Sequence, residues 1–286
     1  MAKNLQLPPG AALDWTVPQD WGAYTPTEHG TWDKLFARQS EMLPGRVVSA
    51  FMEGLDVLRM ARPGIPDFAE LNVRLMAATG WQVVAVPGLV PDEIFFGHLS
   101  KRRFVAGRFI RKPEELDYLQ EPDIFHDVFG HVPLLAQPVF ADYMQAYGEG
   151  GLRAAKLGMI AELARLYWYT VEFGLIEEGD ALKIYGAGIV SSYGESIFAL
   201  DDLSPNRIGF DLERVMRTRY RIDDYQQAYF VIGSFEDLLA QTRDADFGPL
   251  YDRLRGSPAI EVADLLPSDR VLTRGTQAYA RAKESA

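Results

Sequence analysis

The sequence of 286 residues contains no cysteine and only four histidines. The lack of cysteine excludes disulfide bonds, thiolate metal sites and cysteine nucleophiles, and it is compatible with a reducing compartment. Any metal site in this chain must therefore be built from histidine and carboxylate side chains. Because histidine is so scarce, the position of each one is informative.

An excess of positive charge is also missing, since 29 lysines and arginines face 40 acidic residues and the net charge is −11. Proteins that bind nucleic acid or anionic membranes need basic patches, so neither partner is expected. No apolar run approaches the roughly 18 residues needed to span a bilayer. Residues 1–10 lack the apolar stretch of a signal peptide. We expect a soluble, acidic, cytoplasmic protein.

Apolar residues make up 48% of the chain, and most of them follow a helical spacing. This spacing, with the prolines and glycines, predicts helices at 31–43, 46–61, 67–78, 134–155, 159–173, 192–200, 211–218 and 234–243. Short β-branched or aromatic runs predict strands at 81–86, 104–110, 181–185 and 229–232. The expected fold class is mainly α with a few short β-strands (α+β). We expect one domain over residues 1–286, with a surface arm at 1–30 and a tail without a coiled coil at 256–286.

Two of the histidines, His126 and His131, lie in one apolar run, Pro122-Asp-Ile-Phe-His-Asp-Val-Phe-Gly-His131. On an α-helix, residues five apart point roughly 140° away from each other. The pair is therefore not the i, i+4 histidine pair of zinc peptidases. The two side chains can share one ligand if a helix begins near residues 121–122 and ends at Gly130, and Pro133 favours an end there.

The environment of the pair favours a metal ion. The alternative is two core histidines that have ordinary hydrogen-bond partners. Asp123 and Asp127 flank His126, and carboxylates beside ligating histidines commonly fix the orientation and tautomer of the ring.

A third ligand is suggested by Glu172 in Tyr167-Trp-Tyr-Thr-Val-Glu-Phe-Gly174. A buried carboxylate without a partner is costly, so Glu172 needs a cation or a hydrogen-bond donor. A pair with arginine or lysine, or a position on a polar face, is the alternative. Two histidines and one carboxylate are typical of a non-haem Fe(II) site with open positions. A catalytic zinc ion with two histidines and one glutamate fits the same ligands.

Three segments carry a resemblance to a known family: Glu121-Pro-Asp-Ile-Phe-His-Asp-Val-Phe-Gly-His-Val-Pro-Leu134, Tyr167-Trp-Tyr-Thr-Val-Glu-Phe-Gly-Leu175 and Tyr185-Gly-Ala-Gly-Ile-Val-Ser-Ser-Tyr-Gly-Glu195. In order and spacing they resemble the pterin-dependent aromatic amino acid hydroxylases, above all the short bacterial phenylalanine 4-hydroxylases. The resemblance covers roughly residues 15–245. It implies Fe(II) held by His126, His131 and Glu172, with a tetrahydropterin as the reductant and O2 as co-substrate.

The resemblance also implies where the pterin and the amino acid bind. In the family the pterin stacks on a phenylalanine and contacts the loop before it, which implies a pterin-binding set of Gly88, Leu89, Val90, Phe95, Asp127 and Tyr167. A family arginine that binds the substrate carboxylate corresponds to Arg111, a plausible bidentate partner. The implied substrate-binding set is Arg111, Pro122, Asp123, Trp168, Phe173, Gly188, Ser191 and Ile222.

The resemblance also implies roles for individual residues. Asp123 is expected to orient Arg111 or a ligating histidine, and Ser191 to hydrogen-bond His126. Ile222 and Trp168 occupy positions at which the family members that act on phenylalanine differ from those that act on tyrosine or tryptophan. Both residues favour L-phenylalanine as the substrate.

Some features depart from the animal members of the family. Asp127 stands where they carry glutamate, and Leu119 stands where they carry a threonine near the substrate. The chain lacks their N-terminal regulatory domain and C-terminal tetramerisation helix, so we expect a monomer that the substrate does not activate allosterically.

Other functions stay open at this stage. A member of the same family that hydroxylates tryptophan, or another ring position of phenylalanine, is the nearest alternative. A zinc hydrolase with the same two histidines and glutamate belongs to a different class. A non-catalytic protein that binds an amino acid or a pterin is the third, and the three ligands together argue against it.

Overall fold

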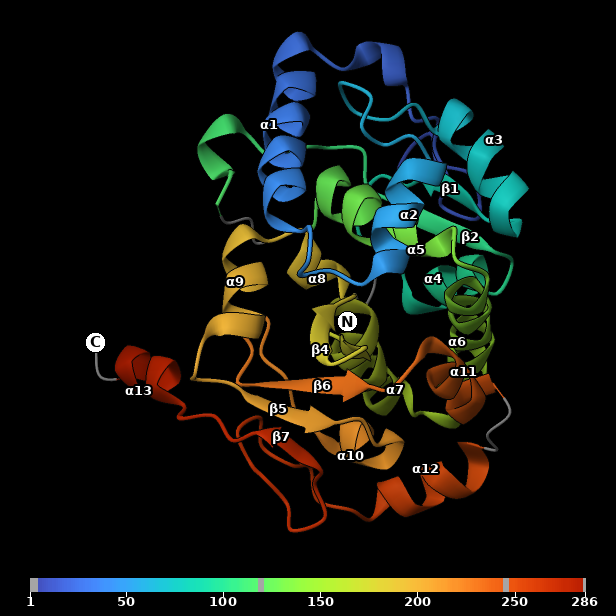
Figure 1. The fold of residues 1–286 in the computed structure, drawn as a ribbon. Helices are drawn as coiled ribbons and strands as arrows, with labels where there is room; N and C mark the ends of the chain where they lie inside the picture. The colour runs from blue at the N-terminus through green and yellow to red at the C-terminus, as the bar shows by residue number, and fades with distance from the viewer. Residues whose placement is uncertain (1–4, 118–120, 244–246, 285–286) are drawn as a thin grey trace. The chain divides into compact units, whose positions relative to one another are not determined.

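The computed structural model describes residues 5–117, 121–243 and 247–284 (Figure 1). The chain divides into two compact units. Unit 1 comprises Met1–Pro44 and Ser49–Gly158, and unit 2 comprises Gly45–Val48 and Met159–Ala286. Helices dominate both units and the strands are short, so the prediction of an α+β fold rich in helix is confirmed. Within the described residues, no helix has the length and apolar character required to cross a membrane.

Unit 1 is mostly helical and contains one pair of parallel strands, β1 (Gln82–Ala85) and β2 (Arg103–Ala106), with Gln82 opposite Arg103. Its principal helices are α1 (Pro26–Met42), α2 (Ser49–Val57), α3 (Phe68–Thr79), α4 (Asp92–Leu99), the π-helix η3 (Phe125–His131), α5 (Val132–Leu135) and α6 (Pro138–Leu157), and its short 3-10 turns are η1 (Trp21–Ala23) and η2 (Pro113–Glu115).

Local sequence signals explain where these helices begin and end. A capping box of Thr25 and Glu28 and a proline in the first turn start α1. The Asp67 side chain caps α3, which ends at Gly80 in the left-handed region with φ 75°. In the core, α2 lies against α5 so closely that a Cβ on Gly54 would sit 2.1 Å from the carbonyl oxygen of Pro133.

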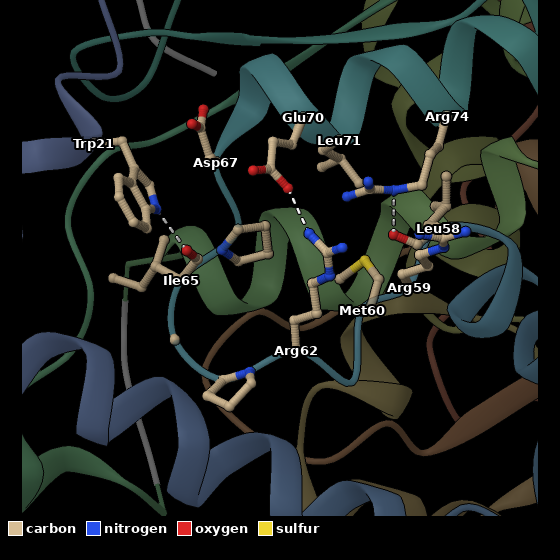
Figure 2. A pocket seen from close by; sticks show the side chains of 13 residues that line it. Trp21, Leu58, Arg59, Met60, Arg62, Ile65, Asp67, Glu70, Leu71 and Arg74 are labelled. Atoms are coloured by element: carbon tan, nitrogen blue, oxygen red, sulfur yellow. Dashed lines mark hydrogen bonds and ion pairs between the residues drawn. The ribbon is translucent and has the colours of Figure 1, made fainter.

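A pocket of about 220 Å³ lies in unit 1, beside the loop that connects α2 to α3. Figure 2 shows the side chains that line it. The Trp21 indole donates a hydrogen bond to the Ile65 carbonyl oxygen (2.7 Å), and Arg74 Nε donates one to the Leu58 carbonyl oxygen (2.8 Å). These two hydrogen bonds hold the loop near its start, at Leu58, and near its end, at Ile65. None of the predicted site residues lines this pocket.

Unit 2 contains a five-stranded sheet in the order β4-β3-β6-β5-β7 (Figure 1). Strand β3 (Leu175–Glu178) is antiparallel to β4 (Ala181–Ile184), while β6 (Ala228–Ile232) is parallel to both β3 and β5 (Asn206–Gly209). β7 (Val271–Thr273) closes the edge antiparallel to β5. The helical elements are α7 (Ile160–Tyr167), the π-helix η4 (Trp168–Glu172), α8 (Ala187–Val190), α9 (Tyr193–Asp201), α10 (Leu212–Arg217), α11 (Phe235–Arg243), α12 (Phe247–Arg255) and α13 (Ala278–Glu284).

Several of the expected element boundaries were wrong. The arm predicted at 1–30 already contains η1 and the start of α1. The helix predicted at 134–155 is two helices, because the Gln137 side chain caps a new helix that begins at Pro138. The helix predicted at 159–173 changes to a π-helix at Trp168, and the strand predicted at 104–110 ends at Ala106. The expected tail at 256–286 contains β7 and α13.

Candidate metal centre

The two histidines of the apolar run lie on the π-helix η3. A π-helix forms i→i+5 hydrogen bonds, so residues five apart are separated by about one turn. The spacing that is unfavourable on an α-helix therefore brings the rings of His126 and His131 together, with centroids 5.0 Å apart and planes at 88°. Their Nε2 atoms are 3.3 Å apart.

The predicted helix end at Gly130 was wrong. After His131 the chain continues directly into α5, and Pro133 lies in the first turn of that helix. Proline is tolerated there because the first-turn N–H groups have no partner within the helix. The π-helix, and not a helix end, is what brings the two imidazoles together.

Glu172 is the last residue of the second π-helix, η4. Within the described part of the chain, one group of side chains could hold a metal ion. Each of His126, His131 and Glu172 offers one ligand atom, and these atoms lie within 4.8 Å of one another.

The donor set fits a transition-metal ion. Two nitrogens at about 2.1 Å from one ion, on neighbouring coordination positions, are about 3.0–3.4 Å apart. The observed Nε2–Nε2 distance of 3.3 Å lies in that range. Two imidazoles and one carboxylate leave other positions open, as in non-haem iron and catalytic zinc sites.

The residues around the histidines hold η3 in place. One carboxylate oxygen of Asp123 accepts a hydrogen bond from the backbone N–H of His126 (3.0 Å). Asp127 Oδ2 accepts one from the N–H of Gly107, just after β2 (2.7 Å). The Phe104 ring of β2 lies 4.8 Å from the His131 ring, centroid to centroid. The start of the π-helix is thus tied to the strand pair of unit 1.

Arg111 is held rigidly by Asp123. Arg111 Nε and Nη2 donate to the two carboxylate oxygens of Asp123 at 2.8 and 3.0 Å, and the backbone N–H of Arg111 adds a bond of 2.9 Å. Asp123 is fully buried and Arg111 is 9% exposed. Burial alone would raise the pKa of Asp123, but the hydrogen bonds and charge of Arg111 outweigh it and lower that pKa. A guanidinium has five N–H donors, so this bidentate pair leaves donors for a ligand.

Four of the predicted pterin-binding residues of unit 1 lie on one loop and the helix that follows it, and the fifth, Asp127, lies on η3. Gly88, Leu89 and Val90 belong to the loop between β1 and α4, and Leu89 is 60% exposed. Phe95 lies on α4, with its ring centroid 5.7 Å from that of Phe96. A Cβ on Gly88 would meet nothing within 4 Å, so the backbone of this loop is open to a ligand.

The predicted residues of unit 2 cluster around η4. Tyr167 ends α7, and the Trp168 indole stacks on Tyr220 with centroids 4.4 Å apart. The centroid of the Phe173 ring lies 4.7 Å from that of the Trp168 ring. A Cβ on Gly188 would come within 2.8 Å of Phe173, so glycine is needed there for close packing.

The remaining predicted residues have simpler surroundings. The Ser191 hydroxyl donates to the Ala187 carbonyl oxygen (2.7 Å). Ile222 is 76% exposed and Pro122 is also exposed. Leu119, where the chain departs from the animal proteins, lies outside the described residues.

A buried polar cluster made of Glu195, Gln226 and Tyr229 was not predicted from the sequence. Glu195 is 4% exposed, and its Oε1 accepts hydrogen bonds from the Tyr229 hydroxyl and the Gln226 backbone N–H. Burial raises the pKa of Glu195 to about 7. In the sequence Glu195 stands between Gly194 and Ser196, so it lacks the apolar flanks that single out Glu172.

Comparison with known proteins identifies the family. Residues 17–248 match the biopterin-dependent aromatic amino acid hydroxylases, which confirms the resemblance inferred from the three segments. The phenylalanine-4-hydroxylase of Caulobacter vibrioides is 67% identical over 275 residues, which are 96% of this chain and 93% of that protein. A structure of Chromobacterium violaceum phenylalanine hydroxylase with bound oxidised Fe(III) has a TM-score of 0.89 at 56% identity, covering 91% of this chain and 94% of that one. The iron- and phenylalanine-bound form has a TM-score of 0.87 at 53% identity, covering 91% and 95%. The chain therefore belongs to the biopterin-dependent aromatic amino acid hydroxylases.

Proposed function

We propose that this protein hydroxylates L-phenylalanine to L-tyrosine, using Fe(II), a tetrahydropterin and O2. The observation that carries the proposal is the group of two histidines and one glutamate with ligand atoms within 4.8 Å. The family supports the pterin, and relatives named phenylalanine-4-hydroxylase support the substrate. The related Chromobacterium violaceum enzyme binds iron and phenylalanine.

In this proposal His126, His131 and Glu172 hold the iron. Bound iron, with electrons from the pterin, supplies the activation of O2. These three side chains would bind the iron on one side and would leave its remaining coordination positions free. Asp123 contributes by accepting the N–H of His126 at the start of η3.

Arg111 is proposed to bind the substrate carboxylate. Its pair with Asp123 fixes the plane of the guanidinium before the ligand arrives, so little side-chain entropy is lost on binding. Pro122, Trp168, Phe173, Gly188, Ser191 and Ile222 are proposed to surround the aromatic ring. For the pterin, the Phe95 ring supplies a stacking face and Gly88, Leu89 and Val90 supply open backbone, with Asp127 and Tyr167 completing the set.

The direct test is to incubate the protein with Fe(II), a tetrahydropterin, O2 and phenylalanine and to identify the product. We expect tyrosine, formed in step with oxidation of the pterin. A different ring isomer, or turnover of tryptophan in place of phenylalanine, would assign another member of the family. Hydrolytic activity with zinc, without pterin or oxygen, would contradict the proposal altogether.

The ligand assignment is tested with His131→Ala and Glu172→Ala. We expect both variants to lose bound iron, measured by elemental analysis, and to lose tyrosine formation while circular dichroism stays close to that of the wild type. Asp269→Asn, a change in the buried Arg214–Asp269 pair, is the control and should keep its iron. Full activity with retained iron in either ligand variant would refute the assignment.

The proposal extends to the working state of the protein. We propose a single-domain monomer that acts in the cytoplasm, either in the catabolism of phenylalanine or in the supply of tyrosine. The absence of cysteine and the acidic charge support this setting. Size-exclusion chromatography with light scattering should give the mass of one chain, and the mass of a dimer or tetramer would refute the monomer.

A further inference from the structure

Glu195 has a place in unit 2 that the proposed chemistry does not use. It lies in the first turn of α9 and is 4% exposed. Both of its hydrogen bonds described above reach one oxygen, from the Tyr229 hydroxyl on β6 and from the backbone N–H of Gln226. Because a buried carboxylate is costly, a leucine here would satisfy packing alone more cheaply. The polar contacts therefore suggest a positioning role.

Gln226 connects Glu195 to Trp168. Gln226 is 3% exposed, and its side-chain oxygen accepts the indole N–H of Trp168 (2.9 Å). The amide orientation follows from the neighbouring groups, because an indole N–H can only donate. The amide nitrogen donates to the carbonyl oxygens of Arg221 (3.0 Å) and Asp224 (3.3 Å).

The same glutamine thus holds two parts of the proposed substrate site. One is the indole edge of Trp168, whose face is stacked on Tyr220. The other is the turn at residues 221–224, which carries Ile222. Displacing Gln226 would release both, because its oxygen serves the indole and its nitrogen serves the turn.

We propose that Glu195 is a positioning residue for the hydroxylation: by fixing Gln226, it sets the orientation of the Trp168 indole and of the turn that carries Ile222, and so holds the aromatic ring of the substrate in register. This inference rests on the proposed function, in which Trp168 and Ile222 face that ring. Glu195 itself contacts neither the reacting atoms nor the proposed metal ligands in the bonds described.

The activity test is the coupling ratio, tyrosine formed per tetrahydropterin oxidised, which does not depend on the folded fraction. In Glu195→Ala we expect the ratio to fall by about threefold or more, because small misplacements of reacting groups are costly. Glu195→Gln should stay near the wild type, since its amide oxygen can accept both hydrogen bonds. Asp269→Asn is the matched control: it perturbs another buried polar pair and should leave the ratio unchanged.

A double-mutant cycle tests the route through the indole. Trp168→Phe removes the N–H that Gln226 accepts, so Glu195→Ala should lower the coupling ratio less in that background than in the wild type. Equal effects in both backgrounds would overturn the proposal. Should Glu195→Ala fail to fold, Tyr229→Phe is the milder variant, because it removes one donor and keeps the ring; its loss of coupling must also shrink in the Trp168→Phe background.

Indole NMR separates failure of this inference from failure of the proposed function, because it needs no turnover. The chain has five tryptophans, and the Trp168→Phe variant assigns the Trp168 indole signal. That signal should shift and exchange faster with solvent in Glu195→Ala, and stay in place in Glu195→Gln. A wild type that makes no tyrosine, with this NMR response present, refutes the function and with it the role of Glu195 in positioning the substrate. An unchanged signal together with unchanged coupling refutes the inference alone.

Discussion

Replacing Glu195 by glutamine should change how the stability of the protein depends on pH. Burial raises the pKa of this carboxyl to about 7, from an ordinary value of 4.5. The titratable groups that act on it are Tyr229, which donates a hydrogen bond, and Asp224, whose negative charge raises the pKa further. Glutamine has nearly the same shape and cannot ionise, so the substitution isolates the charge.

The sign follows from proton linkage. Between pH 4.5 and about 7, the folded protein holds a proton on Glu195 that the unfolded chain has released. The contribution of Glu195 to stability is therefore complete below pH 4.5 and is lost as the pH rises through 7. At about 1.4 kcal/mol for each pH unit over this interval, the loss is about 3 kcal/mol.

The assay is urea unfolding of the wild type and Glu195→Gln, followed by circular dichroism at several values from pH 5 to 8.5. The free energy of unfolding of the variant, minus that of the wild type, should rise by about 2–3 kcal/mol across this range. Groups that titrate alike in both proteins cancel in this difference. A difference that stays flat, or that falls toward high pH, would refute the burial of an ionisable carboxyl at this position.

Three further predictions concern other parts of the chain. Asp123→Asn removes the charge that pairs with buried Arg111, so the free energy of unfolding should fall by about 3 kcal/mol in urea titrations, and the KM for phenylalanine should rise about tenfold in steady-state assays. Gly54→Ala should lower the free energy of unfolding by about 1–3 kcal/mol, because its Cβ would overlap a backbone oxygen of α5; Gly30→Ala, with open space around its Cβ on α1, should instead stabilise by about 0.5–1 kcal/mol. Fe(II) under nitrogen, at 100 times its Kd, should raise the free energy of unfolding by about 2.7 kcal/mol, and calorimetry should find no such gain in Glu172→Ala.

The helices were predictable wherever capping residues and periodicity agreed. The predicted helix at 67–78 corresponds to α3, Phe68–Thr79, because Asp67 and Gly80 mark its two ends. The strands were harder. β5 consists of Asn206–Gly209, and all four of its residues are buried, so it shows no alternation of polar and apolar side chains. The residues of β5 do not by themselves favour an extended strand. The strand forms because it pairs with β6.

The three ligand candidates could be predicted because polar side chains stand out in apolar segments. Their local geometry could not, since the residues of an i, i+5 pair point away from each other on an ordinary α-helix. The contact of Gln226 with Trp168 joins residues 58 apart in sequence, and no spacing rule predicts such a pair. Glu195 stands between a glycine and a serine in the sequence, and its contact with Tyr229 depends on how α9 packs on β6.

The two π-helices show one structural device used twice. In η3 the i, i+5 pair is His126 and His131, with ring centroids 5.0 Å apart. At η4 the N–H of Phe173 donates to the Trp168 carbonyl oxygen (2.8 Å), and the rings of this i, i+5 pair are 4.7 Å apart. An α-helix would turn each pair roughly 140° apart. π-Helical turns are rare and concentrate at functional sites. Here they occur in both segments that carry ligand candidates, which indicates that the wider turn has a function. It brings two imidazoles together in η3 and two aromatic rings together beside Glu172 at η4.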